Sequence, residues 1–272
     1  MGLVQYPSAL DVSTSSYRDH VSYSAVRTYL NCPQKFFYKY VLGLPETTVA
    51  ASLLFGSAFH EALAAYYRAL MIGFDLPSVE EFLESFWAAW QSRQVEEIRF
   101  GKSDTLDSLG HLAERMFVAF LASDLARPSG VILAVEEELR GSLAEGLPDL
   151  LARLDLVFET EESLVVRDFK TSRTSWDDNK VMTSADQLLL YSDLVSAFTV
   201  DKPIRLEFAV LTKTKAPLAT VHPVNYDPRQ VERIKRIVER VWNAVANEHF
   251  YPNPSHHCAS CSFRKPCREW QG

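Results

Sequence analysis

Residues 154–171 carry the pattern that decides the fold, and they read LDLVFETEESLVVRDFKT. Two stretches with the composition of strands, Leu150–Phe158 and Ser163–Lys170, lie on either side of the acidic segment Glu159–Glu162. Apolar, β-branched and aromatic residues on both sides of a short polar turn indicate two strands joined as a hairpin. The sequence therefore predicts a β-hairpin at this point of the chain.

Two carboxylates and a lysine are expected to meet at one edge of this hairpin. Side chains alternate between the faces of a strand, so Asp168 and Lys170 share a face, and Asp155 can approach Asp168 if the strands pair. Converging carboxylates are costly unless a cation neutralises them, and their hard oxygens favour Mg²⁺ or Mn²⁺. A lysine beside such an ion can position or activate water and offset charge on a phosphate. A D-x-K pattern by itself is more often a solvated hairpin, so further residues have to support phosphodiester hydrolysis.

The order of the other elements predicts a mixed central sheet flanked by helices, an α/β fold. Helical spacing marks the N-terminal part of the chain at Val21–Tyr40, Leu53–Met71, Val79–Arg93 and Leu106–Ala122. After the strand Gly130–Arg140 and the hairpin come a helix at Ser184–Phe198, strands at Ile204–Leu211 and Ala219–Val224, and a helix at Pro228–Asn247. We expect one domain over residues 1–272, with a strand-rich catalytic core at 130–225 and a loop-like tail from Tyr251.

The bulk composition is that of an ordinary globular protein, with 47% hydrophobic and 23% charged residues. A net charge of −7 argues against a non-specific nucleic-acid coat but permits a nuclease with a local basic groove and bound cations. No apolar run is long enough for a membrane span, and residues 1–19 lack the pattern of a signal peptide. A cytoplasmic location without membrane partners is therefore expected.

Three more residues support a hydrolytic site. His60 lies within an amphipathic helical stretch upstream of the hairpin, where it can supply a nitrogen ligand to the same metal ion. Gln187 and Tyr191 lie four residues apart in the helix that follows the hairpin, so they share a helix face. Each of these features has an ordinary explanation, namely a packed histidine and a polar helix edge.

The order His60, Asp155, Asp168-Phe169-Lys170, Gln187-x-x-x-Tyr191 resembles the RecB-like nucleases of the PD-(D/E)XK superfamily. The resemblance covers roughly Ser22 to the C-terminus and implies a restriction-endonuclease-like core. It implies that His60, both acids and the backbone carbonyl of Phe169 bind a divalent metal, that Lys170 is catalytic, and that Gln187 and Tyr191 lie at the edge of the site. One departure is Ala152, where the family often has glycine; it leaves the ligands intact.

All four cysteines form one candidate set, comprising Cys32, Cys258, Cys261 and Cys267. Four thiolates suit zinc or an iron–sulfur cluster, and spacing alone does not decide between them. The neighbouring histidines, His256 and His257, keep zinc open as an alternative. A set with one early and three late members would join residues 20–45 to residues 250–270.

The cysteine pattern resembles the AddB-type nuclease domains and the CRISPR-associated four-cysteine exonucleases. That resemblance implies a structural 4Fe–4S cluster, activity on single-stranded DNA or DNA ends, and a setting in recombination, repair, phage replication or CRISPR adaptation. The leading hypothesis is a metal-dependent DNA exonuclease. The alternative is a non-catalytic nucleic-acid-binding or assembly subunit with a nuclease-like fold and a structural zinc site.

Five basic residues are candidates for a phosphate track along bound DNA, although any one of them is more often a solvated charge. They are Arg27, Arg173, Lys180, Lys213 and Lys215.

Overall fold

The computed structural model describes residues 19–93, 95–196 and 202–270. Contacts divide these residues into two units. We call residues 49–139 and 152–231 the sheet unit, and the described residues of 19–48, 140–151 and 232–270 the cysteine unit. The expectation of one domain over the whole chain stays a prediction.

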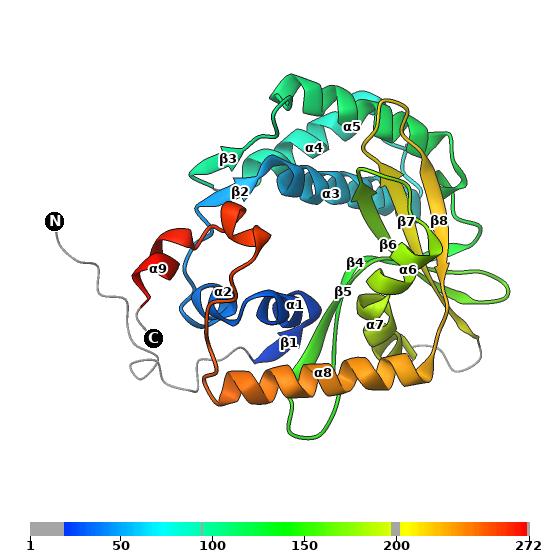
Figure 1. Cartoon of the computed structure of the whole chain (residues 1–272). Coiled ribbons are helices and arrows are strands. Elements are labelled where there is room, and N and C mark those ends of the chain that lie inside the picture. The colour runs from blue at the N-terminus through cyan, green and yellow to red at the C-terminus, as the bar shows by residue number, and fades with distance from the viewer. Residues whose placement is uncertain (1–18, 94, 197–201, 271–272) are drawn as a thin grey trace. The chain divides into compact units, whose positions relative to one another are not determined.

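A mixed sheet organises the sheet unit (Figure 1). Its strands follow the order β4, β5, β6, β7 and β8. Their bounds are β4 (Val131–Gly141), β5 (Asp149–Glu159), β6 (Leu164–Ser172), β7 (Ile204–Thr212) and β8 (Ala219–Val224). The β5–β6 and β7–β8 pairs are antiparallel, whereas β6 and β7 are parallel, with Asp168 opposite Phe208. The predicted hairpin is therefore present, and β6 lies in the interior of the sheet.

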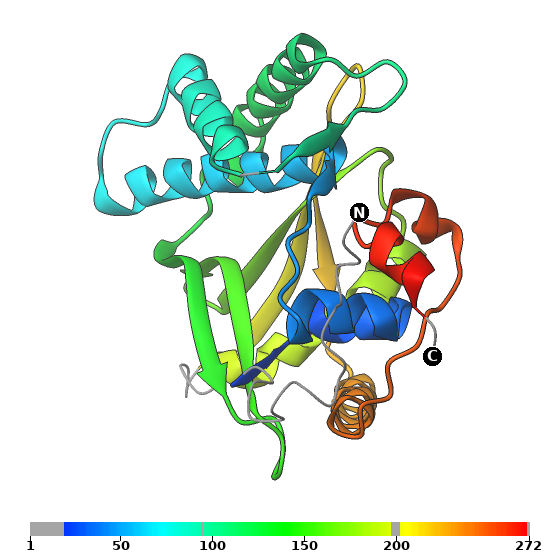
Figure 2. The same ribbon diagram turned by 90° about the vertical axis from the view of Figure 1, so that its left-hand side faces the viewer.

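One face of this sheet is covered by three helices that also pack on one another (Figures 1 and 2). They are α3 (Ala51–Ile72), α4 (Val79–Ser92) and α5 (Leu106–Leu121). The α3 helix buries Phe55, Phe59 and Leu63 at a spacing of four residues, which is the apolar stripe expected of a core-facing helix. Side chains of β6 on the same face, including Phe169, complete this core.

The helix predicted at Ser184–Phe198 corresponds to α7 (Asp186–Ser196), and a short helix that was not predicted, α6 (Asp178–Ser184), precedes it. The end of that prediction, Phe198, lies outside the described residues. The α7 helix packs on β7 through buried apolar side chains such as Leu189 and Leu190. With helices on both faces, the mixed α/β fold is confirmed.

The cysteine unit brings the two ends of the chain together. Its elements are β1 (His20–Ser22), α1 (Tyr23–Asn31), α2 (Pro33–Phe36), a π-helical turn (Phe37–Val41) and most of α8 (Pro228–Ala246), followed by two short helices, η5 (His256–Ser260) and α9 (Arg264–Glu269). The β1 strand pairs in parallel with Asp149–Leu151.

Two expectations for this unit were wrong. The single helix at Val21–Tyr40 is interrupted at Cys32, whose extended backbone precedes Pro33, because proline disfavours helical geometry in the residue before it. The tail was expected to be loop-like but contains η5 and α9. An aromatic cluster of Phe37, Tyr38 and Phe263 anchors it.

The tail is also tied to the first helices by hydrogen bonds. The Tyr29 hydroxyl donates to the His249 carbonyl at 2.7 Å, and the Gln34 peptide N–H donates to the Tyr251 carbonyl at 3.0 Å. The Asn253 side-chain amide donates to the Asn31 carbonyl at 3.0 Å. Packing and hydrogen bonding therefore hold the tail against the first helices.

Among the residues described, no helix combines the length and the apolar character that a membrane crossing requires.

Gly130 is a point where the fold demands glycine. Its φ is +157°, and an added Cβ would lie 2.2 Å from the Glu159 carbonyl oxygen. We expect Gly130→Ala to lower the free energy of unfolding by about 2 kcal/mol or more, because the backbone must move to relieve that overlap. Gly73→Ala is the matched control: its φ is +72°, but nothing lies within 4 Å of the added Cβ, so about 1 kcal/mol is expected. Equal midpoints for the two variants in urea unfolding would contradict this account.

Candidate active site

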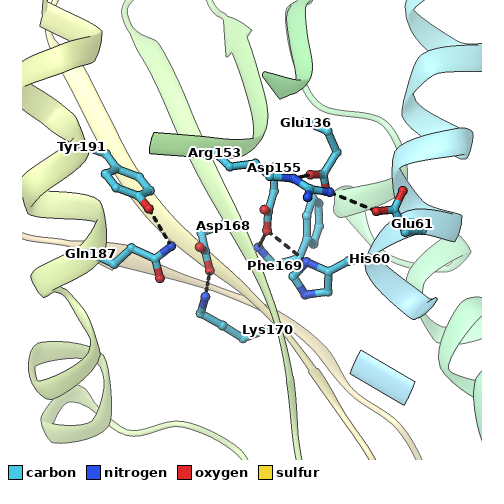
Figure 3. A network of polar contacts seen from close by, with 10 residues as sticks. All are labelled: His60, Glu61, Glu136, Arg153, Asp155, Asp168, Phe169, Lys170, Gln187 and Tyr191. Atoms are coloured by element: carbon cyan, nitrogen blue, oxygen red, sulfur yellow. Dashed lines mark hydrogen bonds and ion pairs between the residues drawn. The ribbon is translucent and has the colours of Figure 1, made fainter. Parts of the chain in front are cut away.

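The hairpin strands stop pairing at the position of the two acids. The register of β5 and β6 runs from Glu159 opposite Leu164 to Leu156 opposite Arg167. Immediately beyond it, a carboxylate oxygen of Asp155 accepts the peptide N–H of Phe169 at 2.8 Å (Figure 3). A side chain of one strand thus satisfies a backbone donor of the other. This contact places the Asp155 carboxylate against the strand that carries Asp168.

His60 reaches the same carboxylate from α3 (Figure 3). Its Nδ1 lies 3.3 Å from Asp155 Oδ2, and its ring meets the edge of the Phe169 ring. Burial acts to lower the pKa of His60, but the Asp155 carboxylate and, to a smaller extent, the Asp168 carboxylate together outweigh burial and raise it. Burial likewise acts to raise the pKa of Asp155, and the His60 ring, with other contacts, lowers it. The two side chains stabilise each other's charged forms.

Glu136 joins this pair and was not found from the sequence. One ligand atom from each of His60, Glu136 and Asp155 lies within 4.8 Å of the others, a spacing suited to one metal ion. Burial, and then the Asp155 carboxylate, raise the pKa of Glu136, while an ion pair with Arg153 lowers it. Arg153 also binds Glu61 at 3.0 Å, so Glu136 is held in place from outside the cluster.

Sequence analysis missed Glu136, and the reason is geometric. It is the first of three consecutive glutamates, 136–138, in β4, and alternation along a strand cannot single out one of them. Its φ of +54° is a left-handed conformation that interrupts the regular strand geometry. The sequence feature that could have drawn attention to this position is the run of three consecutive glutamates.

Asp168 and Lys170 stand side by side, as expected. The Lys170 ammonium lies 2.5 Å from Asp168 Oδ2 and 5.8 Å from the centroid of the Phe208 ring. Asp168 is buried, and burial, opposed by Lys170 and reinforced by Asp155, raises its pKa to about 6. A buried carboxylate with a raised pKa beside another acid is a site where added positive charge would be stabilising.

Gln187 and Tyr191 lie near these acids on α7 (Figure 3). The Gln187 amide donates to the Tyr191 hydroxyl at 3.4 Å. Burial raises the pKa of Tyr191 to about 12, and the Asp168 and Asp155 carboxylates add to that rise. The structure therefore brings all seven sequence-predicted residues of this site into one neighbourhood. Their individual roles, including that of the Phe169 carbonyl, stay predictions.

The four cysteines surround a second site, in the cysteine unit. Cys32, Cys258, Cys261 and Cys267 line one hollow of about 190 Å³. Burial, and then the three other thiols, raise the pKa of Cys267. The Ser255 peptide N–H approaches the Cys258 sulfur at 3.4 Å. The donor set and the space between the sulfurs fit a metal centre held by thiolates.

The spacing of the thiols bears on which metal they fit. Among the described residues, no three cysteine or histidine ligand atoms around the hollow lie within 4.8 Å of one another. Thiolates around one tetrahedral zinc stand about 3.8 Å apart, given Zn–S bonds of about 2.3 Å. The rings of His256 and His257 pack on each other, with centroids 3.9 Å apart, and neither lines the hollow.

Comparison with known proteins points to one family. The profile of the PD-(D/E)XK nuclease superfamily matches residues 20–268. A solved structure from Eubacterium rectale named "Putative exonuclease" has a TM-score of 0.59 at 14% identity, covering 99% of this chain and 94% of the other, which indicates a shared fold. Another solved structure, SSO0001, has a TM-score of 0.35 at 12% identity over 89% and 93% of the chains, below the level that indicates a shared fold. No curated protein matches the chain.

The part played by Glu136 can be measured without any substrate. We expect Glu136→Gln to weaken Mn²⁺ binding to the metal-free protein by about 10- to 100-fold, because a charged oxygen is lost from the cluster. Glu137→Gln, an exposed neighbour, should bind Mn²⁺ like the wild type in the same calorimetric titration. If both variants bind Mn²⁺ with equal affinity, Glu136 is not a metal ligand, and its role is limited to the ion pair with Arg153.

Proposed function

Because the chain belongs to the PD-(D/E)XK nuclease superfamily, we propose that it is a divalent-metal-dependent DNA exonuclease acting on single strands or DNA ends. The observation that carries the proposal is the convergence of His60, Glu136, Asp155 and Asp168, with Lys170 alongside, where the β5–β6 pairing ends. A phosphodiester needs concentrated positive charge and an activated water, and these residues can provide both.

We assign the ligand role to His60, Asp155, Asp168 and the Phe169 carbonyl, with Glu136 as an added ligand. Mg²⁺ or Mn²⁺ bound there would supply Lewis-acid stabilisation of the charge that develops on the phosphate. These carboxylates would hold and orient the ion, since its charge would relieve their mutual repulsion.

The remaining residues act on water and on the substrate. The Lys170 ammonium is held beside Asp168, from where it can donate a hydrogen bond to the attacking water or to a phosphate oxygen. The Tyr191 hydroxyl, kept protonated by its raised pKa, can donate a hydrogen bond at the edge of the site. Gln187 orients that hydroxyl.

Cleavage should disappear when a central group is removed. We expect Asp168→Asn and Lys170→Met each to reduce cleavage by at least about 100-fold, as loss of a charge-stabilising group typically does. Arg115→Met, an exposed basic residue of α5, is the control. End-labelled linear single- and double-stranded DNA and circular DNA, assayed with Mg²⁺ or Mn²⁺ and with EDTA, separate exonuclease from endonuclease action. Wild-type turnover by either central variant, or activity in EDTA, would refute the mechanism.

The Asp168→Asn variant should also differ from the wild type in thermal stability. The raised pKa of Asp168 means that ionisation at neutral pH opposes folding, and that this cost shrinks as the pH falls from about 6 towards 3.8, the ordinary value of the group. Metal-free Asp168→Asn should therefore have a Tm at pH 7 that equals or exceeds that of the wild type. A clearly lower Tm would show that Asp168 is needed for folding, and loss of activity would then not prove a catalytic role.

We propose further that the four cysteines hold a structural 4Fe–4S cluster. Four thiolates that line one hollow of about 190 Å³ are a donor set suited to such a cluster, and neither of the neighbouring histidines lines that hollow. When bound, the cluster would link residues on α1–α2 to the C-terminal tail, adding to the aromatic cluster and hydrogen bonds already there.

The cluster can be tested by colour and by metal content. Protein purified without oxygen should be brown, with absorbance near about 400 nm and about four irons per chain. Cys261→Ser should lose iron, lower the Tm and expose the tail to protease, since metal binding is coupled to folding. Ser260→Ala is the matched control. A colourless protein with one tightly bound zinc would overturn the cluster.

A further inference from the structure

Two basic residues stand beside each other where β6 and β7 end. The peptide N–H of Lys213 donates to the Ser172 carbonyl at 2.5 Å. Lys213 follows the last residue of β7, and Arg173 follows the last residue of β6. Because β6 and β7 are parallel neighbours, this bond sets Lys213 next to the residue that precedes Arg173. Of the five basic residues that the sequence offered as a phosphate track, the structure pairs these two.

The Lys213 ammonium has no carboxylate within ion-pair distance in the described part of the chain. The side chain is half-buried, with its ammonium 5.6 Å from the centroid of the Phe55 ring. Burial, and then the Arg173 guanidinium, lower the pKa of Lys213, and only the Asp104 carboxylate acts in the other direction. Neither Lys213 nor Arg173 forms an ion pair with any residue that the structure describes.

Three other cations in or next to this sheet do form ion pairs. Arg167 pairs with Glu207 at 2.7 Å, Lys170 with Asp168, and Lys202 with Glu159 at 3.2 Å. Taking a cation partly out of water without a partner is unfavourable, and the neighbouring guanidinium adds repulsion. An anion bound between Lys213 and Arg173 would remove both costs.

The position relative to the active site suits a DNA phosphate. Lys170 lies opposite Val210 in the β6–β7 register, and Lys213 is three residues further along the chain, just past the end of β7, which is up to ~10 Å at about 3.3 Å per residue. A DNA strand with one phosphate at Lys170 carries further phosphates within that range. Two adjacent cations with several N–H donors are the usual partners of phosphate oxygens.

We propose that Lys213 and Arg173 form a phosphate-binding site that holds the DNA backbone near the hydrolytic centre. This inference rests on the proposed function, because it assumes that DNA is the ligand. The site positions the strand and takes no part in bond cleavage. Free phosphate has the same chemistry, so the experiment has to separate a nucleic-acid backbone from a small anion.

The test measures DNA binding in a full-length protein that does not cleave. In an Asp168→Asn background, a labelled single-stranded oligonucleotide is titrated at several salt concentrations and followed by fluorescence anisotropy. We expect Lys213→Gln and Arg173→Gln each to weaken binding about 5- to 10-fold and to reduce the slope of log K against log salt by about 0.7, as for one lost phosphate contact. Lys213→Arg should retain affinity.

Arg115→Gln is the control, an exposed basic residue of α5 outside the candidate track, and it should bind like the parent protein. If Lys213→Gln behaves like Arg115→Gln in both affinity and slope, the proposal is wrong. It is also wrong if inorganic phosphate binds at this site while the DNA affinity of the variants is unchanged. In the active enzyme, Lys213→Gln should raise KM more than it lowers kcat, because the site binds the substrate and does not react.

The two proposals fail in different ways. A wild-type protein that binds DNA with the expected dependence on Lys213 but does not cleave it in Mg²⁺ or Mn²⁺ would refute the nuclease and keep the phosphate site. Metal-dependent cleavage by the wild type, together with unchanged DNA affinity in Lys213→Gln, would support the nuclease and refute the phosphate site.

Discussion

The hydrogen bond from the Phe169 peptide N–H to the Asp155 carboxylate is the contact on which the candidate active site depends. In a continued antiparallel ladder, strand backbones would satisfy each other's donors and acceptors. Here the ladder register ends at Leu156 and Arg167, and a side chain takes over. A carboxylate that accepts a backbone N–H in a buried place has a fixed position and a favoured charge. Because the Asp155 carboxylate is fixed in this way, His60 and Glu136 can lie close to it.

This arrangement concentrates negative charge in a poorly solvated place. The resulting repulsion lowers the stability of the fold unless neighbouring groups offset it. Asp168 shows the cost, since its pKa is raised to about 6 despite the adjacent ammonium of Lys170. Arg153 limits the cost by bridging Glu136 and Glu61 from outside the cluster. The aromatic core beneath, in which Phe55, Phe59 and Phe169 take part, holds α3 against β6 and so fixes His60 beside the acids. Functional sites of this kind trade stability for a ready affinity for cations.

The cysteine unit connects described segments from the N-terminal and C-terminal parts of the chain. Cys32 and the late cysteines are separated by more than two hundred residues, and a link between them constrains the unfolded chain strongly. The Tyr29 and Gln34 hydrogen bonds and the packing around Phe263 already connect the same segments. These contacts bring the thiols around one hollow, so a metal centre there would reinforce an existing association and would not have to create it.

Local pattern determined much of this protein. Alternation placed Asp168 and Lys170 on one face of a strand, the acidic turn indicated the hairpin, and helical spacing located α3, α4 and α5, because these features depend on residues close in sequence. Other features depended on contacts that no local pattern encodes. Glu136 enters the cluster through a left-handed residue within a strand, and Lys213 meets Arg173 through the pairing of strands separated by a helical connection. The tail is ordered by aromatic side chains far upstream. Tertiary structure decided these points, since the energy of a charge or an aromatic ring depends on neighbours that only the folded chain brings near.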